Sequence, residues 1–164
     1  MLSRLVIAAA AFTACTLHAQ QSVILVRHAE LGDASGIDAK AVPLSTEGQS
    51  RAQRLSKMLE RSGVSAAYAT DYLRTRATAE PSAMLSRHDV SVVSQDDAKD
   101  FVARLRREHA GQVVLVVGHT DTVPGIIKAL GVSEDVKIDK QDFGNLFIVT
   151  PNAGSPPTLL RLRY

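Results

Sequence analysis

Two histidines each follow a short run of apolar residues, and the two runs have the same pattern. His28 comes after residues 23–26 and Arg27, and His119 comes after residues 113–118. Uninterrupted apolar runs of this length, rich in β-branched residues, are typical of strands buried on both faces of a parallel sheet. Open α/β sheets bind their ligands at the carboxyl ends of such strands. If the two strands are neighbours, His28 and His119 project into one cleft.

Two arginines add fixed positive charge to this pair. Arg27 directly precedes the first histidine, and Arg74 lies near the start of a helix expected over residues 72–86. A cation close to a helix N-terminus opposes the helix dipole, which suggests that a bound anion keeps Arg74 there. The neighbouring Arg76 has a simpler explanation, because it can pair with Glu80 one turn later.

The side chains of Arg27, His28, Arg74 and His119 have the chemistry needed to handle a phosphoryl group. A phosphoryl group in transfer spreads negative charge over three oxygens, and its catalysis is mainly positioning and charge stabilisation. A neutral imidazole can attack phosphorus in line, and a second imidazole can donate hydrogen bonds to the oxygens. We expect this chemistry if the four groups meet. Each histidine taken singly is also compatible with a hydrogen-bonded residue in a turn.

The order of these motifs resembles that of a known family. The segments that carry the resemblance are Arg27-His28-Ala29-Glu30, Leu44-Ser45-Thr46-Glu47-Gly48, Tyr72-Leu73-Arg74-Thr75-Arg76-Ala77-Thr78-Ala79-Glu80 and Gly118-His119. In that order they resemble the histidine phosphatase superfamily, also called the phosphoglycerate mutase-like family. Its pattern is Arg-His-Gly-Glu, a Leu-Thr-x-x-Gly helix start, an arginine before a Thr-Ala-Glu-like helix, and a later Gly-His. Each motif alone is weak, whereas the ordered set is specific.

The resemblance implies a three-layer α/β fold, in which a mostly parallel central sheet carries helices on both faces, as in phosphoglycerate mutase-like proteins. It implies that His28 is the nucleophile that becomes phosphorylated. Arg27, Arg74 and His119 would then bind the phosphoryl oxygens, and water would hydrolyse the phosphohistidine. The family uses no metal ion and no organic cofactor, so neither is expected here.

The chain departs from the family pattern in ways that leave the general acid open. Ala29 stands where the family has glycine, which is a mild change if the backbone there has no positive φ. Mutases carry a glutamate acid within a longer insertion, whereas the corresponding segment here offers only Asp96 and Asp97. Acid phosphatases of the family have an aspartate directly after the second histidine, but here Thr120 precedes Asp121. Asp121 and Asp96 are therefore both candidate general acids.

The chain also lacks the long insertions that roof the pocket in mutases and sugar bisphosphatases. We therefore expect an open pocket and hydrolysis of an exposed phosphomonoester or phosphohistidine, rather than mutase chemistry. The main alternative is a catalytically silent phosphate-binding module of the same fold. A third interpretation takes the histidines as zinc ligands, for which the sequence offers only Glu30 and Asp121 as further ligands, at no recognised spacing.

Local patterns indicate the elements that must position these residues. Ser45 or Thr46 is expected to cap a helix that ends at residues 62–63, with Arg51 among the basic residues of its solvated face. Beyond it we expect strands over 64–69 and 90–93, helices over 72–86, 98–109 and from about 120 to 131, and two edge strands over 146–149 and 159–162, joined by a turn-rich segment over 151–157.

Residues 1–20 have the pattern of a secretory signal peptide, and residues 21–164 form the expected phosphatase domain. A positive start is followed by an apolar, alanine-rich stretch that is too short for a comfortable membrane span. Cys15, the only cysteine, lies in a segment that also resembles a lipoprotein processing site. We expect a periplasmic or secreted protein with no transmembrane span in the mature chain. Processing at Cys15 would instead leave it anchored to lipid.

Composition describes an ordinary globular chain. It has 164 residues, 45% of them hydrophobic and 22% charged, with a formal net charge of +2. That charge is too small and too scattered to indicate nucleic acid as a partner. The expected partner is a phosphorylated small molecule or a phosphorylated component of the cell envelope. The sequence makes no prediction of the oligomeric state.

Overall fold

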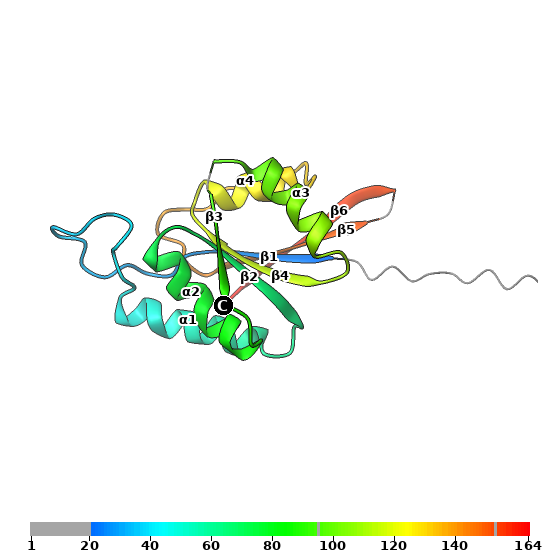
Figure 1. The fold of residues 1–164 in the computed structure, drawn as a ribbon. Coiled ribbons are helices and arrows are strands. Elements are labelled where there is room, and N and C mark those ends of the chain that lie inside the picture. The colour runs from blue at the N-terminus through cyan, green and yellow to red at the C-terminus, as the bar shows by residue number, and fades with distance from the viewer. Residues whose placement is uncertain (1–20, 95, 153) are drawn as a thin grey trace, which may run out of the picture.

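Six strands form one mixed sheet at the centre of the molecule (Figure 1). A computed structural model describes residues 21–94, 96–152 and 154–164. The strands are β1 (Ser22–Arg27), β2 (Val64–Thr70), β3 (Val90–Val93), β4 (Val113–Gly118), β5 (Asn145–Asn152) and β6 (Ser155–Arg163). Their order is β3-β2-β4-β1-β5-β6, in which the first four are parallel and the last two antiparallel. The expected, mostly parallel sheet is confirmed.

Two helices cover each face of the sheet, which makes three layers (Figure 1). One face carries α1 (Thr46–Leu59) and α2 (Leu73–Leu85), and the other carries α3 (Ala98–Glu108) and α4 (Thr122–Ala129). Side chains of β1 alternate between the two cores. Ile24 and Val26 pack with residues of α1 and α2, whereas Val23 and Leu25 pack with residues of α3 and α4. Burial on both faces explains the continuous apolar sequence of β1.

Capping side chains set the starts of two helices. The Ser45 hydroxyl accepts the backbone N–H of Gly48 (3.0 Å), so Ser45 rather than Thr46 caps α1. The Asp97 carboxylate accepts two backbone N–H groups from the first turn of α3. Asp97 therefore serves its own helix.

The hairpin of β5 and β6 extends into the segment expected as a loop. Asn152 pairs with Ser155, so the strand pairing continues well into this segment. Pro156 and Pro157 fit into β6 because an edge strand has N–H positions without a ladder partner. The loop expected over 151–157 is thus too long, while the edge position of the hairpin is confirmed.

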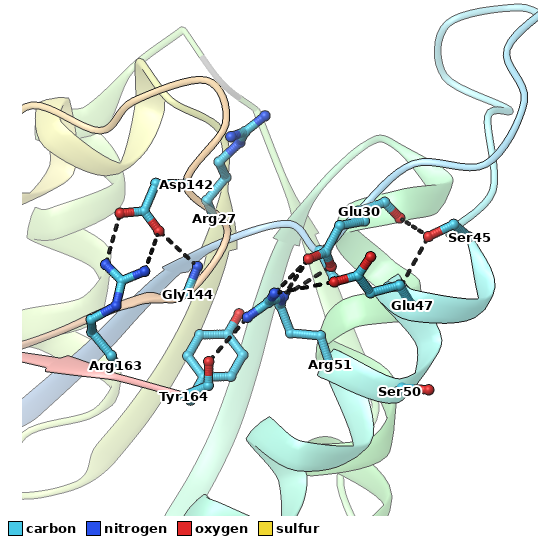
Figure 2. Close-up of polar contacts among 12 residues, drawn as sticks. Arg27, Glu30, Ser45, Glu47, Ser50, Arg51, Asp142, Gly144, Arg163 and Tyr164 are labelled. Carbon is cyan, nitrogen blue, oxygen red and sulfur yellow. Dashed lines mark hydrogen bonds and ion pairs between the residues drawn. The ribbon is translucent and has the colours of Figure 1, made fainter.

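Arg51 does not lie on a solvated face of α1, as expected, but binds Glu30 (Figure 2). Its Nε is 2.8 Å from Oε1 and 2.9 Å from Oε2 of Glu30, and its Nη1 donates to the Tyr164 carbonyl oxygen (3.0 Å). The side chains of both partners are 15% exposed. The expectation is wrong because helical spacing cannot reveal a carboxylate that approaches from a distant segment.

Two further predictions, the signal peptide over residues 1–20 and processing at Cys15, lie outside the described residues. Both therefore stay predictions. In the part of the chain that the structure describes, no helix combines the length and apolar character that crossing a membrane requires.

Gly48 lets α1 pack directly against the segment that follows β1. It is buried, and a Cβ at this position would overlap the carbonyl oxygen of Glu30 and lie 3.0 Å from its backbone nitrogen. The N–H of Ser45 donates to the same carbonyl (3.0 Å). Since Glu30 is two residues beyond His28, this packing fixes the path of the chain next to the histidine.

We expect Gly48→Ala to destabilise the protein by about 1–3 kcal/mol, because the backbone of Glu30 must move away from α1. Gly125→Ala in α4 is the matched control, since Gly125 is exposed and a Cβ there meets no atom within 4 Å. The control should gain about 0.5–1 kcal/mol through helix propensity. Urea unfolding measures both, and a stabilised Gly48→Ala variant would contradict this account of the packing.

Candidate phosphoryl-binding site

The two histidines lie side by side at the carboxyl edge of the sheet. β1 and β4 are neighbours, and their register pairs Arg27 with Gly118, the residues directly before the histidines. The ring centroids of His28 and His119 are 5.3 Å apart. The N–H of His28 donates to the Gly118 carbonyl (2.9 Å), which continues the strand pairing into the site. The structure thus brings together the two histidines that the sequence suggested would meet.

The backbone orients the His28 ring. Nδ1 lies 2.8 Å from the carbonyl oxygen of Ala29, which can only accept, so Nδ1 carries the proton and Nε2 keeps its lone pair. Among the described residues, Arg87 is the only non-glycine residue with a positive φ, so alanine fits where the family has glycine. The N–H of Ala29 donates to the Thr78 hydroxyl (3.0 Å) in α2. Among the described residues Nε2 of His28 has no hydrogen-bond partner, so its lone pair is available.

Arg27 reaches the site from the end of β1. Its guanidinium lies 4.1 Å from the centroid of the Phe143 ring. Its Nη1 donates to the carbonyl oxygens of Lys140 (2.7 Å) and Asp139 (3.3 Å), in the connection between α4 and β5. Its Nε is buried and has no partner within the described residues. Arg27 holds this connection in place and still has a donor to offer.

Arg74 reaches the site from the first turn of α2. Its guanidinium lies 4.1 Å from the centroid of the Tyr72 ring, and its Nη1 donates to the Ala39 carbonyl (2.7 Å) in the loop after β1. The N–H of Leu73 donates to the next carbonyl of that loop, at Lys40 (2.8 Å). As in Arg27, the Nε of Arg74 is buried with no partner in the described part of the chain.

The charge of these two arginines is not neutralised by an ion pair. Neither of them pairs with a carboxylate among the residues that the structure describes. Burial lowers the pKa of both guanidinium groups, and the charge of Arg74 lowers the pKa of Arg27 further. One buried and one half-buried cation with unused N–H donors favour an anion between them, above all a dianion with several oxygens.

The site is more covered than we expected from the short chain. His28 is only 4% exposed and His119 only 7%. Tyr72 packs edge-on against His119, with 4.8 Å between ring centroids, and Phe143 lies 6.1 Å from the His28 ring. The expectation of an open pocket is therefore corrected for the histidines themselves. Tyr72, at the start of α2, and Phe143, in the connection between α4 and β5, thus pack against the two rings.

The two candidate acids lie in different surroundings. The Asp121 carboxylate accepts the N–H of Thr122 (2.8 Å) at the start of α4, and its charge acts on His119. Asp96 is exposed and lines a hollow of about 520 Å³ beside Tyr72. Of the two candidates, Asp121 is thus the one whose charge acts on His119.

Glu30 is unsuited to the zinc interpretation because its carboxylate is engaged by Arg51. Within the described residues, no group of three or more His, Cys, Asp or Glu side chains is arranged to hold a metal ion.

Five residues of the site were not identified from the sequence. Two are aromatic, Tyr72 and Phe143, and three are buried threonines, Thr70, Thr75 and Thr78. Thr70 ends β2, the strand next to β4, so its place at the same sheet edge as the histidines was a usable signal. No periodic pattern marks Phe143, which lies in an irregular connection.

Both histidines favour the neutral form. Burial, ahead of the charges of Arg27 and Arg74, lowers the pKa of His28 to about 3, against its hydrogen bond to Ala29. Burial, followed by the charge of Arg74, lowers the pKa of His119 to about 4, and the charge of Asp121 opposes this shift. Near neutral pH the site therefore contains two cations and two neutral imidazoles.

These pKa values predict that the protein loses stability on mild acidification. An unfolded histidine gains its proton near pH 6.5, whereas the folded ones resist it until about pH 3 and about pH 4. As the pH falls from about 7 to about 5, the free energy of unfolding should therefore decrease by about 1–2 kcal/mol for each of the two histidines. Urea unfolding in buffers without multivalent anions measures the loss. The double variant His28→Gln/His119→Gln should lose much less, and equal losses in both proteins would contradict the shifts.

Comparison with known proteins agrees with this geometry. The family model of the histidine phosphatase superfamily (branch 1) matches residues 23–97. That segment contains Arg27, His28 and Arg74, whereas His119 lies beyond it. No curated protein matches the chain.

Three solved structures with a similar fold are phosphatases. The protein histidine phosphatase SixA, determined with tungstate, has a TM-score of 0.71 and 18% identity, with 87% of this chain and 96% of that chain covered. A mycobacterial glucosyl-3-phosphoglycerate phosphatase has a TM-score of 0.67 and 13% identity, with 88% and 98% covered. A phosphoserine phosphatase variant from Entamoeba histolytica, determined with phosphoserine, has a TM-score of 0.65 and 12% identity, with 85% and 94% covered. The family match covers less than half of the chain, and the solved structures show that the chain shares their fold.

Proposed function

We propose that the protein is a phosphatase that hydrolyses a phosphomonoester, or a phosphohistidine, through a phosphohistidine intermediate on His28. The observation that carries the proposal is the meeting of two neutral imidazoles with two guanidinium groups that have no ion-pair partner among the described residues. The fold shared with phosphatases supports it.

In the first step, the Nε2 lone pair of His28 attacks phosphorus and forms a P–N bond. The bond from phosphorus to the leaving group breaks on the opposite side, and the leaving oxygen or nitrogen takes up a proton. Arg27 and Arg74 bind the phosphoryl oxygens, because charge builds up on these oxygens during transfer. The hydrogen bond from Nδ1 of His28 to Ala29 keeps the attacking nitrogen in place.

In the second step, water attacks the phosphohistidine. Water gives one proton to the carboxylate that protonated the leaving group, the P–N bond breaks, inorganic phosphate forms, and His28 recovers its lone pair on Nε2. Both steps need charge stabilisation and proton transfer, which the arginines and a nearby acid supply, so we propose that the reaction requires no metal ion.

Two features support a proposal for the substrate class, namely the missing insertions and the expected signal peptide. The site lacks the large insertions of mutases, which favours hydrolysis over isomerisation. The expected signal peptide over residues 1–20 supports a periplasmic or secreted enzyme, lipid-anchored if the chain is processed at Cys15. We propose a phosphorylated small molecule or envelope component as the substrate.

Trapping the intermediate tests the proposal. After brief incubation with p-nitrophenyl phosphate, the wild type should carry acid-labile, base-stable phosphate, and His28→Ala should carry none and turn over substrate at a rate lower by at least about 10³-fold. Turnover should survive strong chelation by EDTA. A silent binding module would bind the phosphate analogue tungstate without forming the adduct, and that result would replace the phosphatase proposal by the alternative.

We further propose Asp121, rather than Asp96, as the general acid. Asp121 is two residues from His119 and acts on it electrostatically, whereas Asp96 lines the hollow beside Tyr72. Asparagine can replace aspartate at the start of α4 without loss of the cap, so Asp121→Asn separates acid chemistry from folding.

Asp121→Asn should lower kcat/KM for an alkyl phosphate by about 10²-fold, because an alkoxide leaves poorly without a proton. The loss should be smaller for p-nitrophenyl phosphate, whose leaving group is stable as an anion. Asp96→Asn is the matched control and should change both rates little. A large effect of Asp96→Asn that depends on the leaving group would transfer the role to Asp96.

A further inference from the structure

A chain of buried threonine hydroxyls ends on His119. The Thr70 hydroxyl oxygen lies 2.7 Å from His119 Nε2 and 3.1 Å from the Thr75 hydroxyl oxygen. The Thr75 hydroxyl in turn donates toward the carbonyl oxygens of Thr70 and Tyr72, at 2.8 Å each. Thr70 is 3% exposed and Thr75 fully buried, so water cannot easily take the place of these partners.

The direction of the hydrogen bonds along these threonines determines which nitrogen of His119 carries the proton. Carbonyl oxygens only accept, so the single Thr75 proton goes to one of them, and Thr75 can only accept from Thr70. The single Thr70 proton is thereby used, and Thr70 must accept from His119. Nε2 therefore carries the proton in the neutral ring, and Nδ1 has the lone pair. In the reverse arrangement, Thr75 would have to donate to the Thr70 hydroxyl and give up both of its carbonyl contacts.

His28 and His119 are thus held in opposite tautomers. His28 is protonated on Nδ1 by its contact with Ala29, and His119 on Nε2 by its contact with Thr70. No side chain or backbone group of the described residues hydrogen-bonds to Nδ1 of His119, so this nitrogen is the one available to a ligand. In this tautomer Nδ1 of His119 carries a lone pair, which would repel the oxygens of a phosphoryl dianion.

We propose that His119 takes up one proton on Nδ1 when the site binds a phosphoryl dianion, and that Thr70 is the positioning residue that enforces this uptake. This inference rests on the proposed function only in that the site binds such a dianion. The proton comes from solvent, or from the substrate itself when that arrives as a monoanion. The resulting imidazolium donates from Nε2 to Thr70 and from Nδ1 to the ligand.

The groups around His119 agree with uptake on binding rather than before it. Arg27 and His28 face it from the end of β1, Tyr72 and Arg74 from the start of α2, and Asp121 from the start of α4. The two arginines oppose a third positive charge in the free site. A dianion reverses this balance, because two negative charges then lie among the cations. Affinity and proton uptake are consequently linked.

Calorimetric titration with tungstate tests the proposal, because tungstate is a dianion across the neutral range and needs no turnover. In two buffers of different ionisation enthalpy, the wild type should take up about one proton per tungstate bound, and Kd should rise about tenfold per pH unit above neutrality. Binding without proton uptake would overturn this inference alone. No binding of tungstate would overturn the proposed function as well.

Variants locate the proton. Thr70→Val removes the acceptor with little change of shape, so His119 can adopt the other tautomer and donate from Nδ1 while neutral. Proton uptake should then fall toward zero, and Thr70→Ser should restore it. Uptake should persist in His28→Ala and vanish in His119→Gln. Loss of uptake in His28→Ala, with uptake retained in His119→Gln, would place the proton on His28 and overturn the proposal.

The tautomers of His28 and His119 can also be measured directly in the ligand-free wild-type protein. This measurement does not depend on whether the variants fold. Nitrogen-15 shifts of the imidazole rings should show a protonated Nε2 in His119 and a protonated Nδ1 in His28. A protonated Nδ1 in free His119 would overturn the proposed direction of the threonine chain.

Discussion

Two guanidinium groups, one buried and one half-buried, are the constraint on which the site depends, since neither pairs with a carboxylate among the described residues. Arg27 and Arg74 repel each other, and burial of each carries a desolvation cost. What keeps them in place is the backbone, because each donates to carbonyl oxygens of a loop, and the ring of an aromatic residue covers each guanidinium. The fold thus holds two positive charges close together, at a place where a ligand with several oxygens can neutralise them. Burial, and after it the charges of these arginines, keeps the two histidines neutral.

The fold could be predicted because its strongest signals are local. A strand buried on both faces requires a continuous apolar run, and β1 and β4 both have one. Helix α3 has an apolar stripe of Phe101, Val102 and Leu105, all buried. The meeting of His28 and His119 also followed from local sequence, since each ends a central parallel strand. Neighbouring parallel strands leave their ends little freedom to separate.

What escaped prediction depends on contacts between distant segments. Arg51 looks like any basic residue of an exposed helix face until Glu30 is placed beside it. Phe143 lies in an irregular connection, and its position over Arg27 is set by the anchoring of that connection. Asp142 accepts two hydrogen bonds from Arg163 of β6, as Figure 2 shows, and these, ahead of its bond from the Gly144 N–H, lower the pKa of Asp142 to about 2. Such tertiary ion pairs leave no periodic signature.

The order of strands in the sheet has a consequence for how the site comes into being. β1 lies between β4 and β5, and β4 lies between β1 and β2, so the central pairing joins segments about ninety residues apart. Pairings of such high contact order form late and slowly, because a long stretch of chain must be closed first. The local hairpin of β5 and β6 has no such barrier. The pairing that places His28 beside His119 can therefore form only after the long segment between them has been made and brought together.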